Sequence, residues 1–132
     1  MEKGLPKFEN KIWGLNLKKL DRFRKGFELK IIFSEKAVAD LESIFENILD
    51  YSHSKEEAYY VVNSIEKSID VLKNPFVSGS IPYSARIANL GYKQIPIVDG
   101  NYLVFFLTQI DKKLRIVDYI KPTKTNYENS IC

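Results

Sequence analysis

The sequence predicts an α+β fold in which two amphipathic helices pack on an antiparallel sheet. Two stretches of helical periodicity follow one another after a short break. An alternating apolar run precedes them, and three short strand-like runs follow them. The chain has 132 residues, of which 45% are hydrophobic, so we expect one domain with a sizeable core.

The first 27 residues form a distinct basic block. The apolar side chains within it recur at roughly helical spacing, and lysines and arginines lie between them. This pattern predicts a short amphipathic helix that ends near Gly26. We therefore treat residues 1–27 as an N-terminal extension. Its predicted apolar face includes Trp13, Leu17 and Leu20.

The domain itself is predicted to begin with a strand and a helix. Residues 27–33, FELKIIF, alternate between apolar and polar positions, which is typical of a strand. Ser34 is suited to cap a helix that follows. Residues 35–51 then place their apolar side chains on one stripe, and the opposite face is acidic.

A second helix is predicted to start at Ser54. Ser54 and Glu57 have the spacing of a capping box, in which each side chain binds a free backbone N–H of the first turn. The apolar stripe continues to about Lys73, and Asn74-Pro75 ends it. Two helices so closely joined predict an antiparallel hairpin.

The last part of the domain is predicted to be a three-stranded meander after a loop at residues 76–90. Its strands are residues 92–98, 102–109 and 114–120, joined by short polar turns. Pro96 cannot donate a ladder hydrogen bond, so its strand belongs at an edge or a bulge. The tail from Lys121 is polar.

The middle strand raises the question of what covers the second face of the sheet. Residues 102–107, YLVFFL, are apolar at every position, whereas a strand with one wet face alternates. We expect the extension, through Trp13, Leu17 and Leu20, or a separate protein chain to cover Leu103 and Phe105. Arg86, in the loop before the meander, is a further candidate for a partner contact, and a salt bridge within the loop is the alternative.

Charge is distributed unevenly along the chain. Residues 1–30 carry nine basic and four acidic side chains, residues 31–75 four and nine, and residues 76–132 seven and four. The net charge is +3. This distribution permits an acidic or polyanionic partner at one side, but the basic excess is too small to establish nucleic-acid binding.

Several classes of protein are not expected. The chain has no apolar run of membrane-spanning length and no secretory signal. The single cysteine, Cys132, suits the reducing cytoplasm. No metal-binding cluster or phosphate-binding glycine loop is present, so we expect no metal and no cofactor. His53, the only histidine, falls in the break between the helices, where a turn residue is the simplest interpretation.

Three stretches resemble one known family. They are residues 33–41, FSEKAVADL, residues 72–79, LKNPFVSG, and residues 100–106, GNYLVFF. In this order and at this spacing, they resemble the RelE/ParE superfamily of toxins from bacterial type II toxin–antitoxin systems. The resemblance covers residues 28–127 as a toxin domain. It leaves the extension at 1–27 and a short tail at 128–132 outside the family pattern.

The resemblance implies a cytoplasmic protein that inhibits growth and is neutralised by a cognate antitoxin, as in plasmid stabilisation systems. RelE-like members are mRNA interferases that cleave mRNA on the ribosome, whereas ParE-like members inhibit DNA gyrase. The resemblance does not fix the oligomeric state and is compatible with a homodimer. It also leaves open a third case, an inactive member that serves only to bind an antitoxin.

The residues favour the ParE-like alternative. A metal-free nuclease needs acid–base groups and cations that bind phosphate. RelE-like enzymes have an arginine after the tyrosine of the third strand, but here Leu103 follows Tyr102. The predicted hairpin is also long, as in ParE-like members. Whether the protein is an enzyme stays open, and a nuclease site would have to use Lys93, Lys121, Lys124 and Tyr127.

Overall fold

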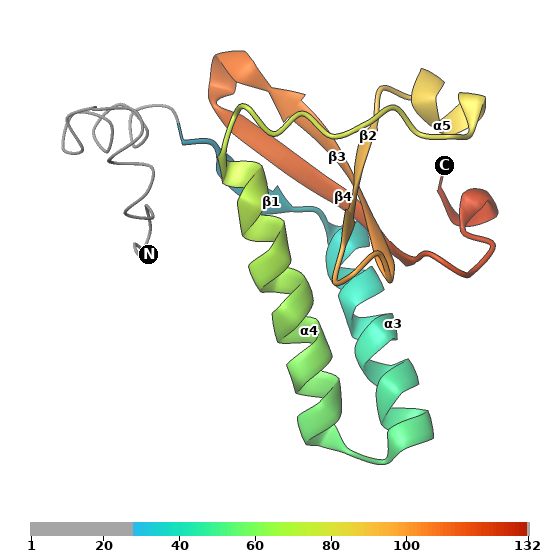
Figure 1. Cartoon of the computed structure of the whole chain (residues 1–132). Helices are drawn as coiled ribbons and strands as arrows, with labels where there is room; N and C mark the ends of the chain where they lie inside the picture. Colours follow the sequence, from blue (N-terminus) through green and yellow to red (C-terminus); the bar gives the residue numbers. More distant parts are fainter. Residues whose placement is uncertain (1–27, 132) are drawn as a thin grey trace, which may run out of the picture.

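A helical hairpin covers one face of a four-stranded sheet in the computed structural model, which describes residues 28–131 (Figure 1). The strands lie in the order β1-β4-β3-β2. The elements are β1 (Lys30–Phe33), α3 (Glu35–Ser52), α4 (Lys55–Ile69), the 3₁₀ turn η1 (Asp70–Lys73), α5 (Ala85–Asn89), β2 (Lys93–Ile97), β3 (Tyr102–Gln109), η2 (Ile110–Lys112), β4 (Leu114–Pro122) and η3 (Glu128–Ser130).

The sheet is mixed, which corrects the expectation of a wholly antiparallel sheet. Strands β2, β3 and β4 form the predicted antiparallel meander. Strand β1, however, pairs in parallel with β4. The hairpin returns the chain to the start of β1, where the Leu29 N–H donates to the Lys73 carbonyl at 2.8 Å. The meander that follows then ends with a strand in the same direction as β1.

Serine side chains cap the N-termini of both hairpin helices, as the sequence predicts. The Ser34 side chain accepts a hydrogen bond from the Ala37 N–H, and that of Ser54 accepts one from the Glu57 N–H. The second arm of the predicted capping box is replaced, because the Ser54 N–H donates to the Ser52 hydroxyl. The last predicted turn of α4 is the 3₁₀ turn η1 instead.

The main core lies between the hairpin and the helix-covered face of the sheet. The predicted apolar stripes of both helices are buried there, although Phe45, Val61 and Val62 remain partly exposed. The stripes meet residues of β2, β3 and β4 that face the helices. These core residues are Ala37, Leu41, Ile44, Ile48, Ala58, Ile65, Ile69, Leu72, Ile97, Val104, Phe106, Val117 and Ile120.

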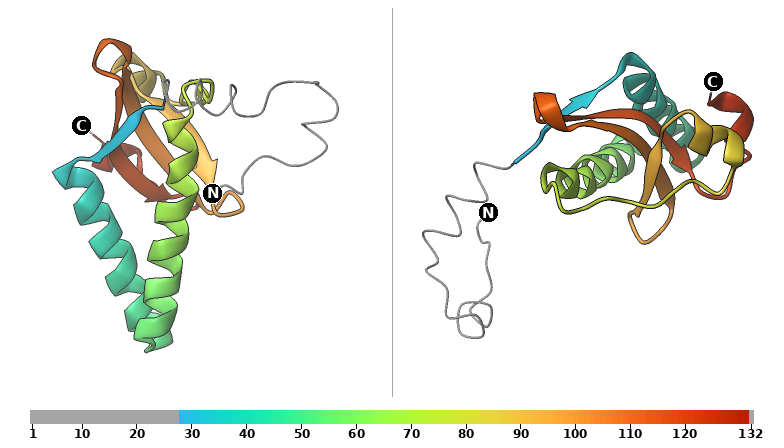
Figure 2. Two further views of the ribbon diagram at one scale, coloured as in Figure 1. Left: turned by 90° about the vertical axis from the view of Figure 1, so that its left-hand side faces the viewer. Right: turned by 90° about the horizontal axis from the view of Figure 1, so that it is seen from above.

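The second face of the sheet is covered by the chain's own C-terminal half. Leu103 and Phe105 are buried against Ile87 of α5 and against Ile131, which is 1% exposed. Figure 2 shows α5 and the C-terminal segment together on this side of the sheet. The expectation that this face awaits the extension or a partner is therefore wrong for Leu103 and Phe105. Trp13, Leu17 and Leu20 lie outside the described residues.

The covering helix differs from the sequence expectation. Helix α5 lies within the predicted loop, where Ser84 caps it through the Ile87 N–H. The polar tail after β4 packs against the sheet through Tyr127 and Ile131, whereas its other residues are exposed. Arg86 joins the two segments, because its guanidinium donates to the carbonyls of Ile131, at 2.7 Å, and of Glu128.

The edge strand β2 is protected against further pairing. Pro96 lies on it, as predicted, and Ser80 pairs with Gln94 on its outer side. Within residues 28–131, no helix combines the length and apolar character that crossing a membrane requires.

Because Ile131 is buried under α5, we expect Ile131→Ala to destabilise the fold. The loss should be about 2–4 kcal/mol, from lost apolar contact and a residual cavity. Urea unfolding of the full chain measures it. The control is Ile81→Ala, whose side chain is 69% exposed and should change stability by less than about 0.5 kcal/mol. Equal stabilities for the two variants would contradict the packing described.

Candidate functional site

A β-bulge places Asp118 among polar groups on the second face of the sheet. The register of β3 with β4 shifts between Phe105 and Phe106, which pair with Tyr119 and Val117, so Asp118 is the extra residue. Its carboxylate accepts a hydrogen bond from the Tyr92 hydroxyl at 2.5 Å.

Lys36, in the first turn of α3, approaches the same carboxylate. Its ammonium lies 3.4 Å from an Asp118 oxygen and 5.0 Å from the centre of the Tyr119 ring. The hydrogen bond to Tyr119 and the nearby charge of Asp118 raise the pKa of Lys36, although desolvation opposes them. Burial would raise the pKa of Asp118, but hydrogen bonds from Ser34 and Tyr92 and the Lys36 charge outweigh it, so the pKa is lowered.

A second ion pair lies next to this cluster. Lys121 is 2.8 Å from a carboxylate oxygen of Asp40, and the other oxygen accepts the Ile120 N–H at 2.8 Å. Strand β1 pairs with β4 only as far as Val117, so the Asp40 carboxylate supplies the hydrogen-bond acceptor for the backbone N–H of Ile120. The Lys121 ammonium also lies 5.4 Å from the centre of the Tyr119 ring. Two lysines therefore flank Tyr119, and each is paired with an aspartate.

The four predicted nuclease residues do not converge. Lys93 pairs in register with Phe106 and so belongs to the helix-covered face, whereas Lys121 pairs with Leu103 of the second face. The Lys121 charge is neutralised by Asp40. Lys124 is exposed after β4. Tyr127 packs its ring 5.6 Å from that of Phe105.

Arg86 has the alternative role considered from the sequence. Besides binding the two tail carbonyls, its guanidinium lies 3.9 Å from the Glu128 carboxylate. The ion pair is thus internal, although with the tail rather than within the loop. A partner contact through Arg86 would compete with these bonds.

Sequence reasoning missed Lys36, Asp40, Tyr92 and Asp118 as members of a cluster. One signal was present, because Asp118 interrupts an otherwise apolar strand, IVDYI. Such a residue indicates a bulge or a buried pair. The partners on α3 could not be found from spacing, since they depend on the tertiary fold.

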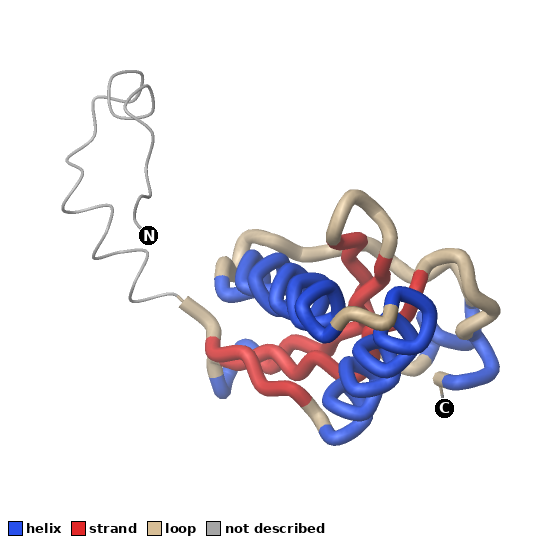
Figure 3. Tube along the Cα trace, turned by 90° about the horizontal axis from the view of Figure 1, so that it is seen from below, coloured by secondary structure: helices blue, strands red, loops and turns tan. Residues whose placement is uncertain are grey.

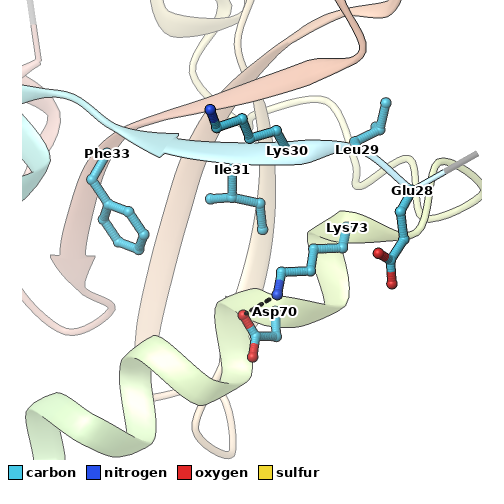
Figure 4. Close-up of a pocket in the computed structure, with 7 residues that line it drawn as sticks. All are labelled: Glu28, Leu29, Lys30, Ile31, Phe33, Asp70 and Lys73. Atoms are coloured by element: carbon cyan, nitrogen blue, oxygen red, sulfur yellow. Dashed lines mark ion pairs between the residues drawn. The ribbon is translucent and has the colours of Figure 1, made fainter. Parts of the chain in front are cut away.

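A hollow of about 560 Å³ lies beside the open edge strand β1 (Figure 4). Figure 4 shows Ile31 and Phe33 pointing from β1 towards the side of α4 and η1, where Lys73 and Asp70 form an ion pair at 3.6 Å. The lining thus combines apolar side chains with both signs of charge. Across residues 28–131, no group of three or more His, Cys, Asp or Glu could hold a metal.

Comparison with known proteins identifies the fold. No protein-family model matches the sequence, and no curated protein matches it. Among solved structures, the chain is similar to one from the chromosomal ParDE TA system of P. aeruginosa, with a TM-score of 0.61 and 16% identity. The match covers 74% of this chain and 99% of that one. The fold is therefore ParE-like, as the sequence resemblance implied.

We expect Tyr92→Phe to weaken the fold in a pH-dependent way. The folded-state pKa of Asp118 is below its ordinary value. Its carboxylate therefore stabilises the fold above about pH 3.9, and this contribution is lost as the pH falls through the lowered pKa. Removing the hydroxyl should cost about 1–2 kcal/mol near pH 7 and less in acid.

Urea unfolding at neutral and acidic pH checks this prediction. Tyr83→Phe is the matched control, because Tyr83 is fully exposed and should change nothing at either pH. A Tyr92→Phe loss that is the same at both pH values would show that the hydroxyl does not act through the carboxylate.

Proposed function

We propose that this protein is the toxin of a toxin–antitoxin pair and that it inhibits growth by binding DNA gyrase. The likeness of the fold to a chain from a ParDE TA system supports the toxin–antitoxin assignment. The separation of the candidate nuclease residues over two sheet faces supports binding rather than bond cleavage. That separation is the observation on which the choice of mechanism rests.

The electrostatics of the second face also favour binding. A metal-free nuclease must offer uncompensated cations to phosphate as negative charge develops in the transition state. Here Lys121 and Lys36 each have a carboxylate partner, and Arg86 is engaged with the tail. The side chain of Leu103, where RelE-like enzymes have an arginine, is buried and apolar. The paired lysines, the engaged Arg86 and the buried Leu103 therefore support binding over cleavage.

The proposed antitoxin has a surface on which to bind. Strand β1 lies at the edge of the sheet, and the hollow beside it exposes parts of Ile31 and Phe33. An extended segment of a partner could lie along this edge, as strands do in β-augmentation.

A supercoiling assay tests the proposed target. Purified protein, free of antitoxin and at micromolar concentration, should abolish supercoiling by gyrase or cause cleaved DNA to accumulate. Added antitoxin should restore supercoiling. Unaffected gyrase would overturn the proposed target.

Ribosome-dependent mRNA cleavage is the second candidate, because Lys36 and Lys121 flank the Tyr119 ring on the face that holds Tyr127. The combined variant Lys36→Gln, Lys121→Gln, Lys124→Ala and Tyr127→Phe, verified as folded by circular dichroism, distinguishes the two. Growth inhibition should be retained if the protein acts by binding and lost if it is a nuclease. An unchanged growth rate on expression of the wild type without antitoxin would instead indicate an inactive, antitoxin-binding member.

A further inference from the structure

The helical hairpin extends beyond the sheet and ends in a tip that contributes only Ala58 to the main core. The tip comprises residues 50–60, at the bottom of Figure 1, and Figure 3 views the protein from that side. Three tyrosines of the tip, Tyr51, Tyr59 and Tyr60, are 71%, 57% and 72% exposed. Exposed aromatic side chains are typical of interaction surfaces.

The hairpin is also the acidic part of the protein. Residues 35–69 carry eight acidic and three basic side chains, whereas the whole chain has a net charge of +3. Seven of the eight acidic residues are exposed. Within residues 28–131, only Asp40 among the eight forms an ion pair. Glu42, Glu46 and Asp50 recur every four residues and form an acidic stripe along α3 towards the tip.

We propose that the tip and this acidic stripe are the surface with which the toxin recognises its target, and that they dock on a positively charged, DNA-binding surface of that enzyme. This inference rests on the proposed function. An enzyme that acts on DNA must present lysines and arginines to phosphates. Carboxylates repeated along a rigid helix complement such a surface, and the tyrosines add apolar contact at low entropic cost.

The location of the tip sets a requirement on the antitoxin. The hollow beside β1 lies at the end of α4 that is joined to η1, whereas the tip lies at the opposite end of the same helix. An antitoxin that neutralises the toxin must therefore extend from β1 along the hairpin to cover the tip.

Two double variants test the proposal in the gyrase supercoiling assay. Tyr51→Ser with Tyr60→Ser removes the two most exposed of the three aromatic rings and leaves Tyr59, which contacts Phe45. Glu46→Lys with Asp50→Lys reverses two of the three charges of the stripe, and a lysine near the end of α3 suits the helix dipole. Each should raise the inhibitory concentration by at least about tenfold, the usual scale for loss of interface anchors.

The control is Glu28→Lys with Asp111→Lys. It makes the same change in net charge at two exposed positions outside the hairpin. Its inhibitory concentration should stay within about twofold of the wild type, as expected for isolated surface charges. Inhibition by the wild type should weaken with added salt, and less so for the stripe variant.

The outcomes separate the inference from the proposed function. If the wild type inhibits gyrase and both hairpin variants do so equally well, the tip is not the target surface. If the control loses as much activity as the stripe variant, net charge rather than this surface is responsible, and the inference also fails. If the wild type leaves gyrase unaffected, the proposed function fails with it. Thermal unfolding followed by circular dichroism verifies that each variant is folded.

Discussion

Strand β3 joins two cores, because its side chains alternate between the faces of the sheet and both sets are buried. Val104 and Phe106 pack against the helical hairpin, and Leu103 and Phe105 pack against α5 and the C-terminal segment. A strand of this kind has no tolerance for a shift of one residue, since the shift would exchange the two sets. The positions of the hairpin and of the tail are therefore both determined by the register of β3 with β4.

The bulge at Asp118 is compatible with this register and adds the polar chemistry of the second face. One extra residue in β4 lets Val117 and Ile120 both join the main core, and it turns the Asp118 carboxylate towards Tyr92 and Lys36. The buried charge is stabilised there by a hydrogen bond and a cation, as buried carboxylates require. The cluster gives a structural role to charged groups, Asp118 and Lys36, that would otherwise suggest catalysis.

Local patterns in the sequence were sufficient to predict the helical hairpin and the meander. Periodicity located the buried stripes of α3 and α4, and Ser34 and Ser54 marked their starts. The parallel pairing of β1 could not be predicted this way, because it depends on where the hairpin returns the chain. The burial of Ile131 has no periodic signal, since a single apolar residue near a terminus forms no pattern. The candidate site was the part predicted least well from the sequence, because residue types alone do not show that Lys93 and Lys121 lie on opposite faces.

The pairing of the first strand with the last has a consequence for synthesis on the ribosome. Lys30 pairs with Leu114, and the second face is completed only by Ile131. The nascent chain therefore exposes β1 and the apolar stripes of the hairpin until nearly all of it has been translated. A product of translation that is truncated before β4 would lack Val117 and Ile120 of the main core and Tyr119 of the second core.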